Sequence, residues 1–293
     1  MASAFDTFLH QAWADHAEQP EAVALRLRTQ TPAPQSPDHL AAVSRLVVHI
    51  CGEHLGAFDD GRWRLHALRT HPFADADVQS ALRVGVAALS LAERASAARK
   101  RFTLGELIRS EGTAAAICVG RNNSERAMEL LRSARHRLAA APDASAATHR
   151  PLAIACNNML WELHERGAAR SAADTQAMLD VAAASRFHWS QAGTWLEVER
   201  ADYGLALAYL SADMFDPALR FGNQCLAGCL ENNAPPYEHF YAHEALARVQ
   251  HARGDRQARA RHMAAAQAAF MSLATDDQEA CRSPLAALQA LAP

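Results

Sequence analysis

Apolar residues recur at helical spacing along almost all of this 293-residue sequence, and no other feature constrains the fold as strongly. The strict alternation of apolar and polar residues that indicates a strand is missing. Alanine is abundant and aromatic residues make up only 6% of the chain, which favours helices because alanine loses least on entering one. We therefore expect an all-α protein of about 13–14 helices.

Capping signals and turn residues divide this pattern into separate helices. Ser3 with Asp6, and Thr103 with Glu106, have the spacing of a capping box. Asp59-Asp60-Gly61 has the composition of a turn. The expected helices cover residues 3–17, a short segment from 20, 38–55, 63–68, 75–99, 104–119, 124–138, 148–165, 172–185, 190–211, 216–231, 236–252, 256–272 and a last segment from Ser283.

The one Pro-rich stretch, residues 29–37, suggests an exposed linker. We predict an N-terminal helical hairpin and linker over 1–36, a region of divergent helical hairpins over 37–145, and regular helix pairs with a C-terminal helix over 146–293. Short connections make consecutive helices run antiparallel, and a succession of such hairpins stacks into an α-α superhelix with a concave and a convex face.

The best-defined of these pairs resembles a tetratricopeptide repeat. Leu205-Ala206 stands where that family has a leucine and a small residue, and Tyr209 where it has tyrosine. After the turn, Phe215 matches the family's aromatic position and Ala218 the small residue that opens the second helix. Small residues let the paired helices approach closely.

Two further copies flank this one. Leu246-Ala247 followed by Gly254-Asp255 begins about 41 residues later, and Met159-Leu160-Trp161 followed by Gly167 begins about 46 residues earlier, against the family's 34. Arg259 occupies a small position of the later copy. The resemblance implies a tetratricopeptide-like scaffold that binds protein segments, and it implies no chemistry.

In such a scaffold the first helix of each pair lines the concave face. Arginine and tyrosine suit peptide recognition because they combine large contact area with directed hydrogen bonds. We predict a non-catalytic scaffold or adaptor for a protein or peptide partner. An exposed apolar face would also allow two copies of the chain to form a homodimer. The alternatives are a regulatory sensor of a small molecule or peptide and an all-helical metal-dependent enzyme. The predicted binding residues are Asn157, Trp161, His164, Arg200, Tyr203, Leu207, Tyr241, Glu244, Arg248 and His251.

Few residue patterns in the sequence suggest a metal-binding or catalytic site. His239 and His243 are four residues apart, so one helix face could direct both imidazoles at one metal, but no H-E-x-x-H motif is present and we predict no metal site. Cys225 and Cys229 continue an apolar stripe and are interpreted as core. Neither Asp59-Asp60 nor Asp276-Asp277 continues as D-D-x-x-D, and the latter reads as the first turn of a helix. We therefore expect no enzyme activity and no cofactor.

Charge and apolar content bound the partners and the location. A net charge of −3 gives no positive field for nucleic-acid binding. The longest apolar runs fall short of the roughly 20 residues that span a bilayer, and the N-terminus lacks the pattern of a secretory signal. Six cysteines without a C-x-x-C pair favour reduced, buried thiols. We predict a cytoplasmic protein that binds neither nucleic acid nor membrane.

Overall fold

The computed structural model describes residues 3–95 and 100–291. Within those ranges the regular structure is fourteen α-helices, one π-helix and one 3-10 helix, without any β-strand. This confirms the all-α prediction. The chain divides into two compact units, residues 1–155 and 156–293, and the boundary falls inside α8 (Ala146–Glu165).

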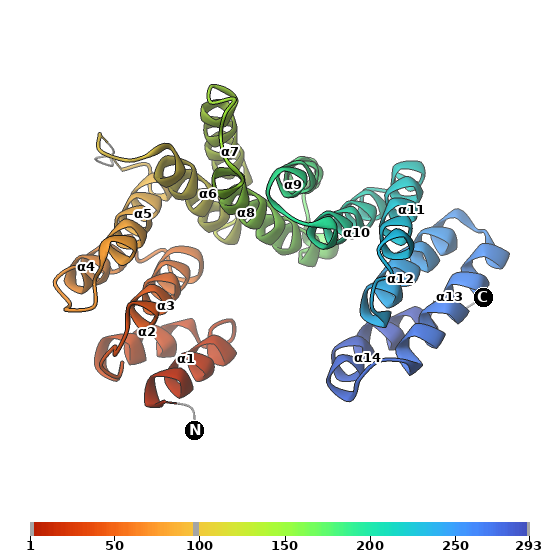
Figure 1. The fold of residues 1–293 in the computed structure, drawn as a ribbon, viewed down its shortest axis with the longest axis horizontal. Coiled ribbons are helices and arrows are strands. Elements are labelled where there is room, and N and C mark those ends of the chain that lie inside the picture. The colour runs from red at the N-terminus through yellow and green to blue at the C-terminus, as the bar shows by residue number, and fades with distance from the viewer. Residues whose placement is uncertain (1–2, 96–99, 292–293) are drawn as a thin grey trace. The chain divides into compact units, whose positions relative to one another are not determined.

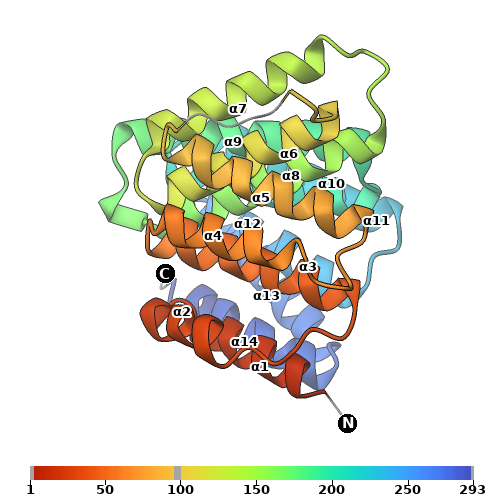
Figure 2. The ribbon, with the colours of Figure 1, turned by 90° about the vertical axis from the view of Figure 1, so that its left-hand side faces the viewer.

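The first unit is built from helices that follow one another in chain order (Figures 1 and 2). α1 and α2 pack on each other, α3 packs on α4 and α5, and α5, α6 and α7 pack in succession. Leucine and isoleucine side chains from α3 to α6 fill the space between them. The helices are α1 (Ala4–Asp15), α2 (Pro20–Thr29), α3 (Pro37–Val48), π-helix η1 (His49–His54), α4 (Phe58–Leu68), α5 (Ala76–Ala92), α6 (Leu104–Gly120), α7 (Ser124–Ala139) and the first part of α8.

Both predicted capping boxes are present in this unit. Ser3 Oγ accepts from the Asp6 backbone N–H at 3.1 Å, and the Ser3 N–H donates to the Asp6 carboxylate at 3.1 Å. The corresponding distances for Thr103 and Glu106 are 3.2 and 2.9 Å. The helix predicted over 75–99 ends at Ala92 as α5, and the predicted residues 96–99 lie outside the described part of the chain.

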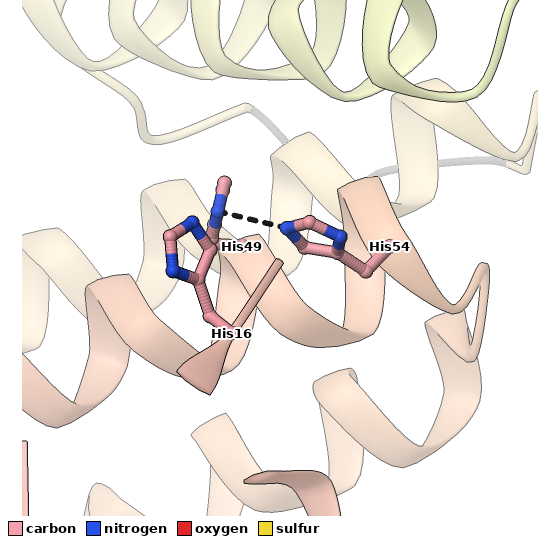
Figure 3. A group of neighbouring side chains, drawn as sticks. All are labelled: His16, His49 and His54. Atoms are coloured by element: carbon pink, nitrogen blue, oxygen red, sulfur yellow. Dashed lines mark hydrogen bonds between the residues drawn. The ribbon is translucent and has the colours of Figure 1, made fainter. Parts of the chain in front are cut away.

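The helix predicted over 38–55 changes character at His49. α3 ends at Val48, and the chain continues as the π-helix η1, which the Leu55 N–H closes by donating to Ile50 O at 3.0 Å. This five-residue hydrogen bond widens the last turn. The π-helix begins with His49 and ends with His54, and the rings of both lie beside His16, which follows α1 (Figure 3).

The turn predicted at Asp59-Asp60-Gly61 is wrong, because all three residues lie in the first turns of α4. Gly61 is buried there, and a Cβ atom at this position would lie 2.9 Å from Cys51 Cβ and 2.8 Å from Leu89 Cδ1. The glycine therefore serves close helix packing and not a change of chain direction. Asp59 and Asp60 occupy the acidic first turn, where they favour the positive end of the helix dipole.

The second unit continues with hairpins of longer helices. Each helix from α9 to α14 packs on the next, α10 also packs on α12, and α12 packs on α14. The unit consists of the end of α8, the 3-10 helix η2 (Gly167–Ala169), α9 (Ala172–Ala192), α10 (Trp195–Ser211), α11 (Phe215–Glu231), α12 (Pro236–Arg253), α13 (Arg256–Met271) and α14 (Thr275–Gln289).

Three predicted helix boundaries in this unit are wrong: the end of α9, the start of α10 and the start of α14. α9 continues past residue 185 to Ala192, and α10 begins at Trp195 behind a capping box of Thr194 and Glu197. The last helix begins at Thr275 and not at Ser283, so that Pro284 lies inside it. The structure does place Asp276-Asp277 in the first turn of a helix, as predicted.

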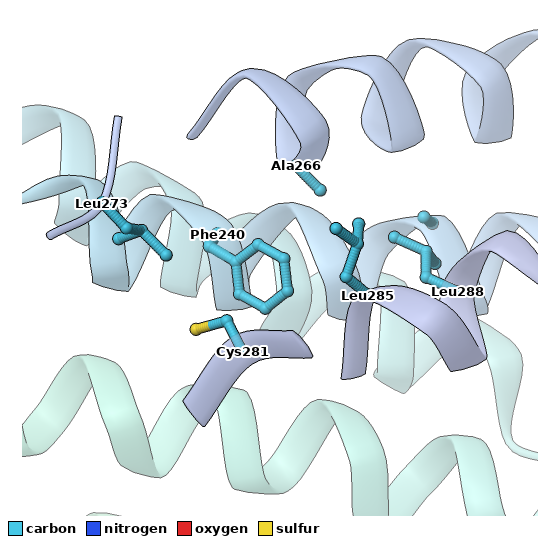
Figure 4. Packing of buried hydrophobic residues seen from close by; sticks show 7 residues of the cluster. Phe240, Ala266, Leu273, Cys281, Leu285 and Leu288 are labelled. Carbon is cyan, nitrogen blue, oxygen red and sulfur yellow. The ribbon is translucent and has the colours of Figure 1, made fainter. Parts of the chain in front are cut away.

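Small residues allow the helices of the second unit to approach closely. A Cβ atom at Gly204 of α10 would lie 2.8 Å from Leu160 of α8, and one at Gly222 of α11 would lie 2.9 Å from Leu246 of α12. The core between α12, α13 and α14 is apolar (Figure 4). Its buried members are Phe240, Ala247, Ala266, Leu273, Cys281, Leu285 and Leu288. None of the helices in the described part of the chain combines the length and apolar character that crossing a membrane requires.

Candidate functional site

Four aromatic side chains form a row on one side of the second unit. Trp161 of α8 lies 6.0 Å from Tyr203 of α10, measured between ring centroids, and Tyr203 lies 5.5 Å from Tyr241 of α12. Tyr237, one turn before Tyr241, extends the row, and its ring centroid lies 5.1 Å from that of Tyr241. All four are half-buried. The row connects three of the predicted binding residues, and we call it, with the charged groups beside it, the α8–α10–α12 surface.

Buried carboxylates on these helices each hold an arginine. Arg200 donates through Nε to Glu238 at 3.2 Å and through a terminal nitrogen to its other oxygen. Arg248 donates to Glu244 on the same helix. The acid side chains are 5% and 2% exposed, whereas those of Arg200 and Arg248 are 56% and 34% exposed. The charge presented to solvent by these two pairs is therefore positive.

Arg186 of α9 repeats this arrangement with Asp202 of α10. Its Nε donates to the Asp202 carboxylate at 3.0 Å, and the two side chains are 37% and 6% exposed. Burial raises the pKa of Asp202, and the Arg186 guanidinium opposes that shift. A buried carboxylate that pairs with a guanidinium restricts where the arginine can point. The acid thus positions the guanidinium.

Tyr203 links the aromatic row to this charged network. Its hydroxyl donates to Glu244 at 3.2 Å. Burial raises the pKa of Tyr203, and the neighbouring Glu244 carboxylate raises it further, so the phenol stays protonated and able to donate. Burial also raises the pKa of Glu244, against the opposing effect of Arg248. Glu244 was predicted to contact a partner directly, but it is 1% exposed and accepts hydrogen bonds from Tyr203 and Arg248 instead.

His164 lies next to Trp161 at the end of α8, with ring centroids 5.6 Å apart. Its Nδ1 is 3.2 Å from Ser211 Oγ of α10. Burial lowers the pKa of His164, and the positive charges of Arg170 and Arg248 lower it further. At neutral pH this imidazole is therefore uncharged. Both the Trp161 ring and the His164 ring are half-buried and contribute neutral surface.

The remaining predicted binding residues lie in different surroundings. Asn157 is half-buried on α8. His251 is exposed at the end of α12, with its Nδ1 3.2 Å from an Arg259 nitrogen of α13. Leu207 is 7% exposed and packs with Ala206 and Ala245, so it belongs to the core and not to a surface that a partner could contact.

The predicted histidine pair has a third neighbour. The rings of His239 and His243 are 6.5 Å apart, while His243 Nδ1 lies 3.1 Å from His262 Nδ1 of α13. Burial lowers the pKa of His243 to about 4, with smaller contributions from His262 and His239. The closest partner of His243 thus comes from another helix, which the sequence spacing did not indicate.

The two cysteines interpreted as core are buried, but they are not in purely apolar surroundings. Cys225 Sγ and Cys229 Sγ lie 2.8 and 3.3 Å from Glu199 Oε1 of α10. Glu199 is 3% exposed, and its Oε2 makes no hydrogen bond within the described residues. Burial raises the pKa of Glu199. Glu199 could not be predicted as their partner, since the apolar stripe that contains the two cysteines gives no sign of a polar neighbour.

A cavity of about 480 Å³ lies in the first unit between α4, α5 and the segment before α6. Of its arginines, Arg62 pairs with Asp59 and Glu93, and Arg83 pairs with Glu106. The acids that pair with Arg62 are exposed to solvent, whereas Glu106 is 4% exposed and leaves the Arg83 side chain, 40% exposed, as the charged group at the surface. The cavity is lined by Arg62, His66, Arg69, Leu82, Arg83, Val86, Ala87, Ser90, Ala95 and Phe102.

Comparison of the chain with protein-family models, with curated proteins and with solved structures finds no match. The fold and its side-chain geometry define an all-α protein of packed helices. The resemblance to the tetratricopeptide family therefore rests on the residues quoted from the sequence.

Proposed function

We propose that α8 to α13 form a tetratricopeptide-like superhelix and that the chain is a non-catalytic scaffold or adaptor whose α8–α10–α12 surface binds a peptide. The occupant is an extended segment that carries acidic and apolar side chains. One observation carries the proposal: two buried acids on α12, Glu238 and Glu244, each hold an arginine whose guanidinium is partly exposed beside a row of aromatic rings.

The charge distribution selects the acidic partner. A guanidinium has five N–H donors, and pairing with one carboxylate leaves donors for a second. Since Glu238 and Glu244 are almost fully buried, a peptide carboxylate can approach Arg200 and Arg248 from the solvent side without displacing these two acids. Tyrosine and tryptophan add apolar contact area at low cost in side-chain freedom.

The dimensions set the length of peptide. Tyr237 and Arg248 are eleven positions apart on α12, which at 1.5 Å per residue is about 16 Å. An extended peptide rises about 3.3 Å per residue, so about five residues span this stretch. Tyr237, Tyr241, Glu244 and Arg248 follow one another at intervals of three or four residues and thus share one helix face.

Fluorescence polarisation with labelled peptides of about eight residues tests this proposal. A peptide that alternates Glu with Leu or Phe binds, and the same peptide with Lys in place of Glu does not. Arg200→Met and Arg248→Met each weaken binding at least about tenfold. Arg282→Met, which changes an exposed arginine on α14, leaves the affinity unchanged.

Higher salt weakens binding of the acidic peptide, because the guanidinium groups are partly exposed and are screened by ions. Equal binding of the Lys peptide, or unchanged affinity in both arginine variants, would show that this surface does not recognise acidic segments. Far-ultraviolet circular dichroism of each variant separates lost binding from lost folding.

The cavity of the first unit supports a second candidate, the small-molecule sensor. Its volume of about 480 Å³ lies within the range typical of ligand pockets. Its wall combines apolar side chains with arginine, which suits a small organic anion. Thermal-shift measurements with a panel of small carboxylates and phosphates test this, and Arg69→Ala should abolish any shift that depends on the cavity.

A further inference from the structure

Three histidines from two helical elements meet in the first unit. His16 directly follows α1, and His49 and His54 are the first and last residues of η1. One ring nitrogen from each residue can be chosen so that all three lie within 4.8 Å of one another. The spacing of these histidines in the sequence does not indicate that they lie together.

The π-helix is what brings His49 and His54 together. In an α-helix, residues five apart are rotated by about 140° around the axis and face different sides. The five-residue hydrogen bonds of η1 place such residues above one another, and the Nε2 atoms of His49 and His54 are 3.1 Å apart (Figure 3). π-helical turns are often found at functional sites.

Contacts to the far nitrogen orient two of the three rings, His16 and His49, and leave their other nitrogen available as a ligand. His16 Nδ1 lies 2.5 Å from Trp13 O, which can only accept, so this nitrogen carries the proton and Nε2 has the lone pair. His49 Nδ1 lies 3.0 Å from Glu53 Oε1, which orients the second ring in the same way. Such carbonyl and carboxylate contacts to the far nitrogen are characteristic of histidines that bind metals.

The distances suit a tetrahedral ion. With Zn–N bonds of about 2.1 Å, tetrahedral ligand nitrogens are about 3.4 Å apart. The His49–His54 pair is already near this separation, and the third nitrogen needs to close by no more than about 1.4 Å, since all three lie within 4.8 Å. His16 directly follows α1 and its side chain is half-buried, so it can make that adjustment.

An aromatic ring and a carboxylate lie beside the cluster. The Trp13 ring covers the cluster, 5.3 Å from His16 and 5.2 Å from His49. Arg121 donates to the backbone carbonyl of His54 at 2.9 Å and not to its ring.

We propose that His16, His49 and His54 bind one divalent transition-metal ion of the zinc class through three imidazole nitrogens. Three neutral imidazoles are typical ligands of such an ion, and the fourth position is left to water. The ion joins the end of α1 to the π-helix. This proposal does not depend on the peptide-binding surface, which lies in the other unit.

Isothermal titration of chelator-treated full-length protein with Zn²⁺ at pH 7.5 tests the proposal. One ion binds per chain, and Co²⁺ in its place gives the visible absorption of a tetrahedral site. His16→Ala and His54→Ala each weaken binding about 10- to 100-fold or abolish it. His10→Ala, which changes an exposed histidine of α1, and His243→Ala leave it unchanged.

Zn²⁺ also raises the melting temperature of the wild type and not that of His16→Ala. Since His16 lies at the end of a helix, His16→Ala should fold even if changes at the π-helix disturb the core, and circular dichroism checks this. Absence of Zn²⁺ binding by the wild type, or equal affinity of the wild type and a folded His16→Ala, overturns the proposal. Loss of Zn²⁺ binding only in His243→Ala would assign the ion to the cluster of His239, His243 and His262, and it would also overturn the proposal.

Discussion

Glu106 should stabilise the first unit through its ionised form. Its carboxylate is 3% exposed and accepts hydrogen bonds from Ser80 Oγ, the Thr103 backbone N–H and Arg83. Burial raises its pKa, but these donors and the charge of Arg83 outweigh burial and bring it from 4.5 to about 2. The perturbation we consider is Glu106→Gln, which keeps the shape and removes the charge.

The lowered pKa sets an upper limit for the effect. A difference of about 2.5 units at about 1.36 kcal/mol each corresponds to about 3.4 kcal/mol at neutral pH. The Arg83 side chain is 40% exposed, so water screens part of this interaction. We therefore expect Glu106→Gln to destabilise the unit by about 1.5–2.5 kcal/mol.

The sign of the pH dependence follows from the direction of the pKa. Because the carboxyl of the folded protein has the lower pKa, its contribution is fully present above pH 4.5 and is lost as the pH falls towards 2. The stability of wild type and Glu106→Gln should differ most at neutral pH. The two should converge near pH 2.

Hydrogen exchange of α6 amides measures the loss of stability in Glu106→Gln, and urea unfolding measures how that loss depends on pH. At neutral pH, exchange through opening of α6 should be about 10- to 70-fold faster in Glu106→Gln. Glu125→Gln, an exposed acid in the first turn of α7, serves as control and should change exchange by less than about fivefold. Unchanged exchange, or a urea difference that stays constant from pH 7 to pH 2, would refute the assignment.

Three other substitutions test separate features of the fold. Gly61→Ala should cost about 1–3 kcal/mol in urea unfolding, because its Cβ would lie 2.9 Å from Cys51 Cβ; a gain in stability would mean that the packing is looser. Tyr203→Phe removes the hydroxyl that donates a hydrogen bond to Glu244, and it should lower the free energy of unfolding by about 1–3 kcal/mol in thermal unfolding. An unchanged melting temperature would mean that the buried Glu244 carboxyl does not depend on this hydrogen bond. Burial raises the pKa of Glu199, so its contribution is present below pH 4.5 and is lost as the pH rises through the folded-state pKa. Glu199→Gln should therefore be more stable than the wild type at neutral pH, and lower stability in urea would show that the ionised form is favoured.

Features that depend on neighbouring residues could be predicted from the sequence. The capping boxes of Ser3 and Thr103 were found because each joins residues three apart. Thr194 and Glu197 carry the same signal, and attention to it would have placed the boundary of α9 and α10 correctly. Burial of the six cysteines followed from the apolar stripes that contain them.

The candidate sites depend on contacts between residues distant in sequence. Arg200 meets Glu238 across 38 positions, and Tyr203 meets Glu244 across 41. The resemblance to the tetratricopeptide family implied that Arg200, Tyr203 and Glu244 line the concave face. The sequence could not show that Glu244 is buried and accepts hydrogen bonds from Tyr203 and Arg248. Burial of a charge depends on which helices pack together, because only that packing supplies the partner which offsets its desolvation.

The segment of α3 and the π-helix combines one feature that the sequence predicts with one that only the tertiary structure decides. Apolar periodicity correctly predicted helix from Asp38 to the region of His54, since the spacing of Leu40, Val43 and Leu46 needs no tertiary information. The change to five-residue hydrogen bonds at His49 has no comparable local signal. A π-helical turn is less stable than an α-helical one, so it persists only where packing of the surrounding side chains compensates. The tertiary structure therefore decided that His54 lies opposite His49.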